Sequence, residues 1–279
     1  MFGWFKSKKL PVEDEQAVQK IENFLDPQAV LDKFTAITGI HFKKKESITT
    51  SKLIHFCRNH HLYSFDELYS RLQSDSAILE ALINVLTVNE TYFFRESRQI
   101  YFFVEKVSRN KEKVRILCAP GSTGEEPYSI AMALLEGGIP AQRIEIISVD
   151  INSDVVALAR EGRYNARSLH KTASSVQEKY FIKEDKIFTI SDDVKRLVSF
   201  YTLNIFDDHL FEMGKFDIIF SRNMLIYFDE STVIRAVERL GRLARSKDSY
   251  LFFGHADFVK TPPTLLERYE EGIKFYTIR

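Results

Sequence analysis

The chain has 279 residues, enough for one large domain or for two domains of unequal size, since a domain typically takes roughly 100–200 residues. Hydrophobic residues make up 44% of the chain and charged residues 28%, a globular composition that excludes collagen-like and broadly disordered proteins. Lys+Arg and Asp+Glu both number 39, so the formal net charge is zero. Attraction to a polyanion therefore has to come from local patches.

Cysteine usage and the N-terminal segment bear on location and metal content. Cys57 and Cys118 are too few for a disulfide framework, and no Cys/His spacing matches a zinc site, so we predict no metal and a reducing cytoplasm. No run approaches the roughly 18 apolar residues of a membrane-spanning helix. The opening segment, residues 1–6, lacks the apolar core of a secretory signal. We expect no stable membrane insertion, and we interpret residues 1–20 as an N-terminal tail.

The first part of the chain has the hydrophobic period of helices. Ser64 followed by Glu67 is a capping box ahead of an apolar stripe, and Gly39 is placed to end an earlier helix. The sequence predicts an all-helical domain of three to five helices over residues 21–88 and a linker helix over residues 89–110. One helical face before Gly39 gathers Val30, Leu31, Phe34 and Ile37.

After residue 110 short apolar strands alternate with helices, which is typical of a parallel sheet. A helix beginning at Pro127 follows the first strand, and a helix over Ser153 to Glu161 follows the second. We predict a three-layer α/β domain over residues 111–279 with an antiparallel final strand. The expected strands lie at 114–118, 144–149, 197–203, 216–220 and 250–254, and a closing hairpin spans 264–279.

The stretch 164–194 interrupts this alternation. It is too long for an ordinary α/β connection, and it carries two short strands of its own, Tyr180–Ile182 and Ile187–Ile190. We interpret it as a small inserted β-subdomain.

The most informative segment, residues 118–129, follows the first strand and opens the first helix, where ligands approach backbone N–H groups. It is not a dinucleotide fingerprint, because its only glycines are Gly121 and Gly124, and carboxylates such as Glu126 would repel a pyrophosphate. Asp150 closes the second strand, where an acidic side chain typically accepts hydrogen bonds from ribose hydroxyls. Each piece alone is explained by a turn or a helix cap. Together they favour a nucleoside site, and S-adenosylmethionine, with a ribose and a sulfonium but no phosphate, is the natural candidate.

Three motifs resemble those of a known family. They are Asn89-Glu90-Thr91-Tyr92-Phe93-Phe94-Arg95, the loop 122–129, and Ser221-Arg222-Asn223-Met224-Leu225-Ile226-Tyr227-Phe228. Over roughly residues 25–279 the chain resembles the CheR family of chemotaxis receptor methyltransferases. The resemblance implies a class I, Rossmann-like S-adenosylmethionine-dependent methyltransferase domain. It further implies methylation of glutamate side chains on the cytoplasmic coiled coil of chemoreceptors, with glutamate γ-methyl esters and S-adenosylhomocysteine as products.

The resemblance also implies roles for individual residues. Arg95 and Tyr227 would lie nearest the transferred methyl group and are the candidate catalytic residues. His255-Ala256-Asp257 departs from the His-Ser-Glu expected there, which puts in doubt any polar role at the end of the last parallel strand. The residues implied in cofactor binding are Asn89, Thr91, Arg95, Gly121, Glu126, Asp150, Asn204, Ile205, Arg222 and Asn223.

A carboxylate substrate makes few chemical demands on the site. With an unperturbed pKa of about 4.3, a glutamate is ionised at neutral pH and needs no general base. We therefore assign no proton transfer to any of the seven histidines. The site has to supply in-line geometry, which can be worth roughly 7–11 kcal/mol.

A basic stretch in the helical region is a candidate docking surface. Such a run is commonly a solvated helix face, but an acidic coiled coil as substrate makes docking an equal alternative. We expect no nucleic-acid partner, because stacking aromatics do not accompany the charges. Between residues 41 and 61 a single acidic residue, Glu46, accompanies Lys43, Lys44, Lys45, Lys52 and Arg58.

In some members of the family the insert binds a receptor's C-terminal peptide as an added strand, and a glycine-rich loop makes room for that backbone. Here the corresponding connection, residues 182–187, is short and charged and contains no glycine. We expect no binding of a C-terminal receptor pentapeptide.

Two other functions stay open at this point. One is a class I methyltransferase acting on a different carboxylate or on a small molecule, which would not need a basic helical domain. The other is a non-catalytic S-adenosylmethionine-binding signalling protein, which would tolerate the loss of Arg95 and Tyr227, although both are present.

Overall fold

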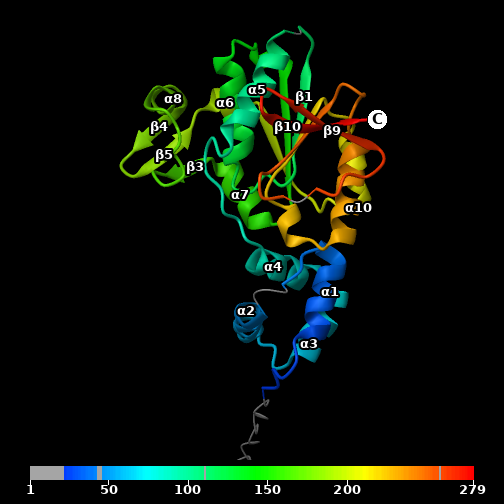
Figure 1. The fold of residues 1–279 in the computed structure, drawn as a ribbon. Coiled ribbons are helices and arrows are strands. Elements are labelled where there is room, and N and C mark those ends of the chain that lie inside the picture. Colours follow the sequence, from blue (N-terminus) through cyan, green and yellow to red (C-terminus); the bar gives the residue numbers. More distant parts are fainter. Residues whose placement is uncertain (1–21, 43–45, 110, 258) are drawn as a thin grey trace, which may run out of the picture.

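The computed structural model describes residues 22–42, 46–109, 111–257 and 259–279 (Figure 1). A helical unit, coloured blue to cyan, lies at one end of an α/β domain. The predicted fold class is confirmed, because an all-helical unit precedes a mixed sheet that carries a small β insert.

The helical unit has a hydrophobic core of its own, with Phe34 and Leu53 fully buried at its centre. The Ser64 hydroxyl accepts a hydrogen bond from the N–H of Glu67 at 3.1 Å, as the capping box predicts. The Glu67 carboxylate accepts from the N–H of Tyr63 (2.8 Å), one residue before the cap. The helices are α1 (Gln28–Thr38), α2 (Glu46–Asn59), α3 (Phe65–Ser74) and α4 (Ser76–Leu86), and α5 (Ser97–Ser108) leads into the α/β domain.

The main sheet has seven strands in the order β6-β2-β1-β7-β8-β10-β9. The first five run parallel, and β10 is antiparallel to both of its neighbours, which confirms the predicted antiparallel final strand. The strands are β1 (Val114–Cys118), β2 (Ile144–Asp150), β6 (Val198–Thr202), β7 (Ile218–Ser221), β8 (Tyr250–Phe253), β9 (Leu265–Glu270) and β10 (Ile273–Ile278).

Alternate residues of β1 enter two different cores, as the two-residue period of a strand requires. Ile116 and Cys118 pack with residues of α5 and α6, whereas Leu117, and Ala119 just after the strand, pack with residues of α10. The sheet is therefore covered on both faces, which gives the three layers predicted from the sequence. The helices of this domain are α6 (Glu125–Glu136), α7 (Ser153–Glu161), α9 (Asp192–Lys195) and α10 (Glu230–Gly241).

Two predicted boundaries are wrong. Helix α6 begins at Glu125 instead of Pro127, because Gly124 takes a left-handed conformation (φ +95°) and proline is tolerated throughout the first turn. Tyr180 ends a helix instead of opening a strand, and its hydroxyl donates to Glu136 at 2.7 Å. The subdomain comprises β3 (Arg163–Asn165), α8 (Ser174–Tyr180), β4 (Phe181–Glu184) and β5 (Ile187–Ile190), with strand order β3-β5-β4.

Candidate functional site

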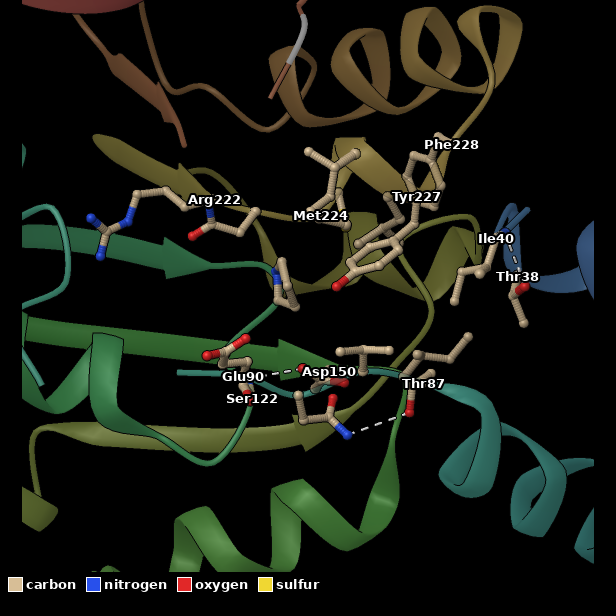
Figure 2. Close-up of a pocket in the computed structure, with 18 of the residues that line it drawn as sticks. Thr38, Ile40, Thr87, Glu90, Ser122, Asp150, Arg222, Met224, Tyr227 and Phe228 are labelled. Atoms are coloured by element: carbon tan, nitrogen blue, oxygen red, sulfur yellow. Dashed lines mark hydrogen bonds between the residues drawn. The ribbon is translucent and has the colours of Figure 1, made fainter. Parts of the chain in front are cut away.

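A cavity of about 560 Å³ lies where the carboxyl ends of the parallel strands face the helical unit (Figure 2). Strand β1 lies between β2 and β7, so chain order reverses at its end, which is where open α/β sheets bind ligands. The cavity brings together every cofactor and catalytic candidate predicted from the sequence. They are Asn89, Thr91, Arg95, Gly121, Glu126, Asp150, Asn204, Ile205, Arg222, Asn223 and Tyr227.

The loop after β1 passes so close to β2 that only glycine fits at its start. A Cβ on Gly121 would lie 1.8 Å from the Ser148 hydroxyl. The Gly121 N–H donates to the carbonyl of Val149 at 2.9 Å, and the next N–H, of Ser122, donates to the Asp150 carboxylate at 2.8 Å. The loop therefore lies directly over the end of β2, with both residues in the cavity wall.

Asp150 is buried at the end of β2, and its two oxygens accept from the N–H groups of Ser122 and Asn152. Burial raises the pKa of this carboxyl above its usual range, and the backbone hydrogen bonds oppose that rise. Each carboxylate oxygen has more than one lone pair, so Asp150 keeps the capacity to accept further hydrogen bonds from a ligand in the cavity.

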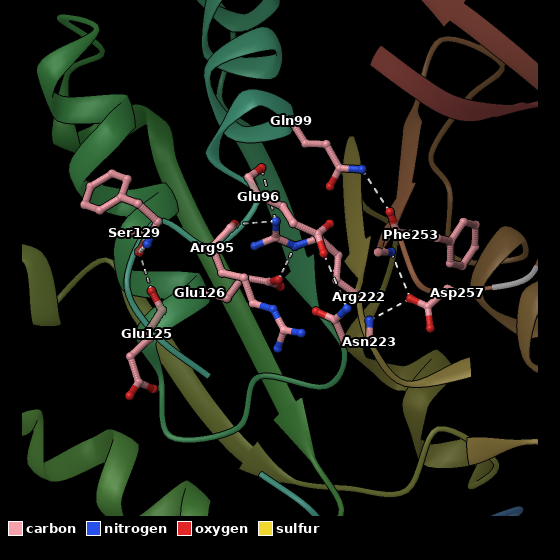
Figure 3. A network of polar contacts seen from close by, with 12 residues as sticks. Arg95, Glu96, Gln99, Glu125, Glu126, Ser129, Arg222, Asn223, Phe253 and Asp257 are labelled. Atoms are coloured by element: carbon pink, nitrogen blue, oxygen red, sulfur yellow. Dashed lines mark hydrogen bonds and ion pairs between the residues drawn. The ribbon is translucent and has the colours of Figure 1, made fainter. Parts of the chain in front are cut away.

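Glu126 and Arg222 form a buried ion pair across the floor of the site (Figure 3). Arg222 is 5% exposed, and its guanidinium also donates to the carbonyl of Arg95 at 2.7 Å. The Arg222 side chain is thus committed to Glu126 and to the segment before α5, so it braces the site as well as lining it.

Two buried oxygen atoms in the cavity wall have no partner within the described part of the chain: Glu126 Oε1 and the Ser122 hydroxyl. Leaving such groups unpaired is costly, so they indicate a ligand with polar groups of its own at this point. The amino acid moiety of S-adenosylmethionine carries an ammonium and a carboxylate, which suit an acceptor and a hydroxyl, respectively. The residues present therefore fit this cofactor.

The adenine end of the predicted site is also the contact between the domains. The Asn204 amide donates to the carbonyl of Ile37 at 2.8 Å, and its oxygen accepts from the N–H of Phe206 at 2.9 Å. Ile205 next to it is buried in the cavity wall. Asn89, also in the cavity wall, has its amide 3.5 Å from the Thr87 hydroxyl.

Arg95 and Tyr227 both line the cavity. The Arg95 guanidinium donates to the carbonyl of Glu90 at 2.9 Å and lies 5.8 Å from the centre of the Tyr92 ring. Burial raises the pKa of the Tyr227 phenol and the positive charge of Arg95 opposes the rise, which places the two groups within electrostatic reach of each other. Figure 2 shows Tyr227 directed into the cavity.

The helical unit supplies one wall of the cavity, a feature that sequence reasoning missed. The N–H of His41 donates to the carbonyl of Tyr227 at 2.9 Å, and His41 Nε2 lies 3.4 Å from Asp229 Oδ2. The Asn152 amide donates to the Thr87 hydroxyl at 2.7 Å. No local pattern marks these residues, because each pairing joins distant parts of the chain.

Asp257 is another residue that sequence reasoning missed. The doubt about a polar role at this position is removed, because the Asp257 carboxylate is buried and accepts from the N–H groups of Asn223 (2.6 Å) and Gly254 (2.8 Å). The signal available in the sequence was the acidic residue itself, shortly after a buried strand.

The docking candidates are only partly visible in the structure. Lys43, Lys44 and Lys45 lie outside the described residues. The Lys52 ammonium donates to the carbonyl of Val85 at 2.9 Å, and Arg58 forms an exposed ion pair with Glu22 at 2.8 Å. Glu22 offsets the charge of Arg58, so the docking surface predicted from the sequence depends mainly on the lysines.

Both cysteines are buried and unpaired. Among the residues that the structure describes, no group of three or more His, Cys, Asp or Glu side chains could hold a metal ion. No helix in the described ranges has both the length and the apolar character needed to cross a membrane.

A parallel sheet with an antiparallel final strand, and a cavity at its switch point with an acid at the end of β2, define a class I methyltransferase. Residues 89–274 match the family model described as CheR methyltransferase, SAM binding domain, and residues 26–87 match CheR methyltransferase, all-alpha domain. The chain belongs to the CheR methyltransferase family, and S-adenosylmethionine is its cofactor.

Curated relatives cover most of the chain. A chemotaxis protein methyltransferase of Campylobacter jejuni is 34% identical over 224 residues, which is 80% of this chain and 84% of the relative. Chemotaxis protein methyltransferase 2 of Vibrio cholerae is 34% identical over 260 residues, 88% of this chain and 90% of the relative. The Escherichia coli chemotaxis protein methyltransferase is 31% identical over 220 residues, 76% of this chain and 77% of the relative.

Proposed function

We propose that this enzyme methylates glutamate side chains on the cytoplasmic coiled coil of chemoreceptors, producing glutamate γ-methyl esters during chemotaxis adaptation in the cytoplasm. The observation that carries the proposal is the placement of Arg95 and Tyr227 in the same cavity as Asp150 and Glu126. Relatives that are named chemotaxis protein methyltransferases support the receptor as substrate.

In this proposal the ten residues predicted to bind the cofactor contact different parts of it. Asp150 accepts hydrogen bonds from ribose hydroxyls, and Glu126 Oε1 accepts from the ammonium of the amino acid moiety. Asn204 and Ile205 flank the adenine. Asn89, Thr91, Gly121, Arg222 and Asn223 complete the binding surface, and Arg95 and Tyr227 face the methyl group.

When bound, S-adenosylmethionine supplies an electrophilic methyl group. A substrate glutamate is ionised at neutral pH, so the residues of this chain need only hold its oxygen in line with the methyl carbon and the sulfur. With the cofactor bound, a cavity that excludes water would favour the reaction, because the negative carboxylate and the positive sulfonium would partly neutralise each other. Arg95 orients the carboxylate, and its bond to the carbonyl of Glu90 keeps part of its hydrogen-bonding capacity occupied.

The test is transfer of tritium from methyl-labelled S-adenosylmethionine to purified chemoreceptor cytoplasmic domains, followed by release of methanol in base. Esters of glutamate release volatile label in base, whereas amide and amine methylation do not. A receptor domain whose methylated glutamates are replaced by alanine serves as the control. Base-stable label, or equal label on the control, contradicts the proposal.

Reversing the charge of Lys44, Lys45 and Lys52 to Glu is expected to raise the KM for receptor about tenfold without altering cofactor affinity, because exposed ion pairs are each worth about 0.2–1 kcal/mol. The matched control reverses Lys111, Lys186 and Lys247, which are exposed elsewhere on the surface. Thermal unfolding of both variants checks for loss of the bond from Lys52 to Val85.

The dependence of methylation on salt concentration is a second test of the basic docking surface. Exposed charges are screened beyond a Debye length of about 8 Å at physiological salt. Methylation by the wild-type enzyme is expected to weaken with added salt, and a KM that is insensitive to salt would leave the basic stretch as a solvated helix face.

A receptor pentapeptide with Trp and Phe anchors is expected not to bind at high micromolar concentration. Strand β4 is an edge of the subdomain sheet, but the turn to β5 holds only Asp185 and Lys186, with no glycine to let a peptide backbone approach. Fluorescence anisotropy against a scrambled peptide measures this. Saturable binding in the low micromolar range overturns the expectation.

A further inference from the structure

We propose that Asp257 is a positioning residue for methyl transfer, which fixes the turn that carries Tyr227. The inference deepens the proposed function and rests on it, since it concerns the geometry of the same reaction. Asp257 is not among the residues that line the cavity, so any effect on the reacting groups has to pass through the residues it holds.

The Asp257 carboxylate joins two segments that follow neighbouring strands. Its Oδ2 accepts from the N–H of Asn223, after β7, at 2.6 Å and from the N–H of Gly254, after β8, at 2.8 Å. Its Oδ1 accepts from the N–H of Ile226 at 3.3 Å. Asp257 is only 7% exposed, so these bonds form away from bulk water. Hydrogen bonds to a charged group are strong there.

The fit around this carboxylate is tight. A Cβ on Gly254 would lie 2.8 Å from the Asn223 nitrogen and 2.9 Å from Asp257 Oδ2. Asn223 itself has a φ of +59°, a left-handed conformation that asparagine adopts more readily than most residues with a side chain. The bond from its N–H to Asp257 fixes the point at which the chain leaves β7 and enters the turn.

Tyr227 lies at the end of the same turn. The 3₁₀ turn η3 (Leu225–Tyr227) begins two residues after Asn223, and the Tyr227 N–H donates to the carbonyl of Met224 at 3.1 Å. Asp257 thus fixes the turn from one side, while the N–H of His41 binds the Tyr227 carbonyl from the other at 2.9 Å. The phenol has little freedom left other than rotation of its own side chain.

The charged groups around the turn are consistent with this role. Burial raises the pKa of Tyr227, Arg95 lowers it, and Glu90 and Asp257 raise it further. The Glu96 carboxylate accepts from the N–H of His255 at 3.1 Å and from the Asn223 amide at 3.4 Å, so it steadies the same two segments from the side of α5.

A first experiment tests the positioning without any activity. In hydrogen exchange on the full chain, Asp257→Asn is expected to raise the exchange rate of the amides between residues 223 and 227 at least tenfold, because an amide group cannot accept hydrogen bonds on both sides. The control is Ser249→Ala at the opposite end of β8, where a buried hydroxyl accepts the N–H groups of Arg245 and Ser246 at 3.1 Å. Unchanged exchange in Asp257→Asn overturns the proposal.

A second experiment separates positioning from plain stabilisation. Asp257→Asn is expected to lower kcat about tenfold and to change the Kd for S-adenosylhomocysteine less. In a Tyr227→Phe background the same change is expected to cost less than about threefold, because coupled residues are not additive. Ser249→Ala combined with Tyr227→Phe should be additive. Additive losses for Asp257→Asn mean that it supports only the fold, and the proposal is wrong.

Two safeguards keep the outcome clear. Asp257→Glu retains both oxygens and is expected to recover most of the lost kcat. If the asparagine variant does not fold, Asp257→Ser, which keeps one acceptor oxygen on a shorter side chain, replaces it in the cycle. If the wild-type enzyme does not methylate receptor at all, the proposed function fails, and the exchange experiment still decides whether Asp257 holds the turn.

Discussion

Arg95→Ala and Tyr227→Phe are each expected to lower kcat about 100-fold while the Kd for S-adenosylhomocysteine changes only a few fold. Both groups line the cavity and in the proposed function face the methyl group, where small misplacements of the reacting atoms cost about 100-fold in rate. Calorimetry and initial rates on the same preparations measure the two quantities. Because the two side chains lie within electrostatic reach, the double variant should lose less than the product of the single losses.

An arginine and a tyrosine that do not line the cavity provide matched controls. Arg98→Ala removes an exposed arginine one turn along, and Tyr201→Phe removes the hydroxyl of a tyrosine that is 40% exposed on β6. Both are expected to keep wild-type turnover. If the affinity for S-adenosylhomocysteine falls as far as kcat/KM does in Arg95→Ala or Tyr227→Phe, the residues are binding groups and their catalytic assignment is wrong.

S-adenosylhomocysteine at 100 times its Kd is expected to stabilise the wild-type protein by about 2.7 kcal/mol, and Asp150→Ala should lose most of that gain. Asp150 lies in the cavity wall, and its carboxylate oxygens can accept further hydrogen bonds. Replacing it with alanine removes the proposed partner of the ribose hydroxyls. Thermal unfolding with and without ligand measures the gain for each variant against its own ligand-free value. This comparison is needed because Asp150 also holds the N–H groups of Ser122 and Asn152.

Asp154→Ala is the matched control for Asp150→Ala, since it removes an exposed carboxylate from the first turn of α7, four residues further along. It should keep the full stabilisation by ligand. An undiminished gain in Asp150→Ala would remove Asp150 from the binding site.

Local rules predicted most of the fold. The apolar run 114–118 and the capping box at Ser64 each depend on residues that are neighbours in sequence, and both are present in the structure. Helix α8 was missed because its seven residues are too few to display an amphipathic period. The strand order depends on pairings between distant segments. The alternation of strands and helices indicated a parallel sheet but not which strands pair.

The candidate site also combines local features, which the sequence predicts, with pairings between distant residues, which it does not predict. The loop glycines and Asp150 could be found because strand ends and helix starts are local features. The partner of Glu126 is 96 residues away, at Arg222, and the partner of Asn204 is 167 residues away, at Ile37. A sequence pattern shows that such a residue is polar and near a motif, but not which group it binds.

The wall that the helical unit contributes to the cavity has a thermodynamic consequence. A receptor that presses on the helical unit acts on the same backbone that holds Tyr227 through His41 and Asn204 through Ile37. If such a contact tightens the cavity around the methyl donor, then the donor, by linkage, strengthens the hold on the receptor by the same factor. The demethylated product lacks the sulfonium charge, so the receptor contact is expected to raise the affinity for the product less than the affinity for the methyl donor.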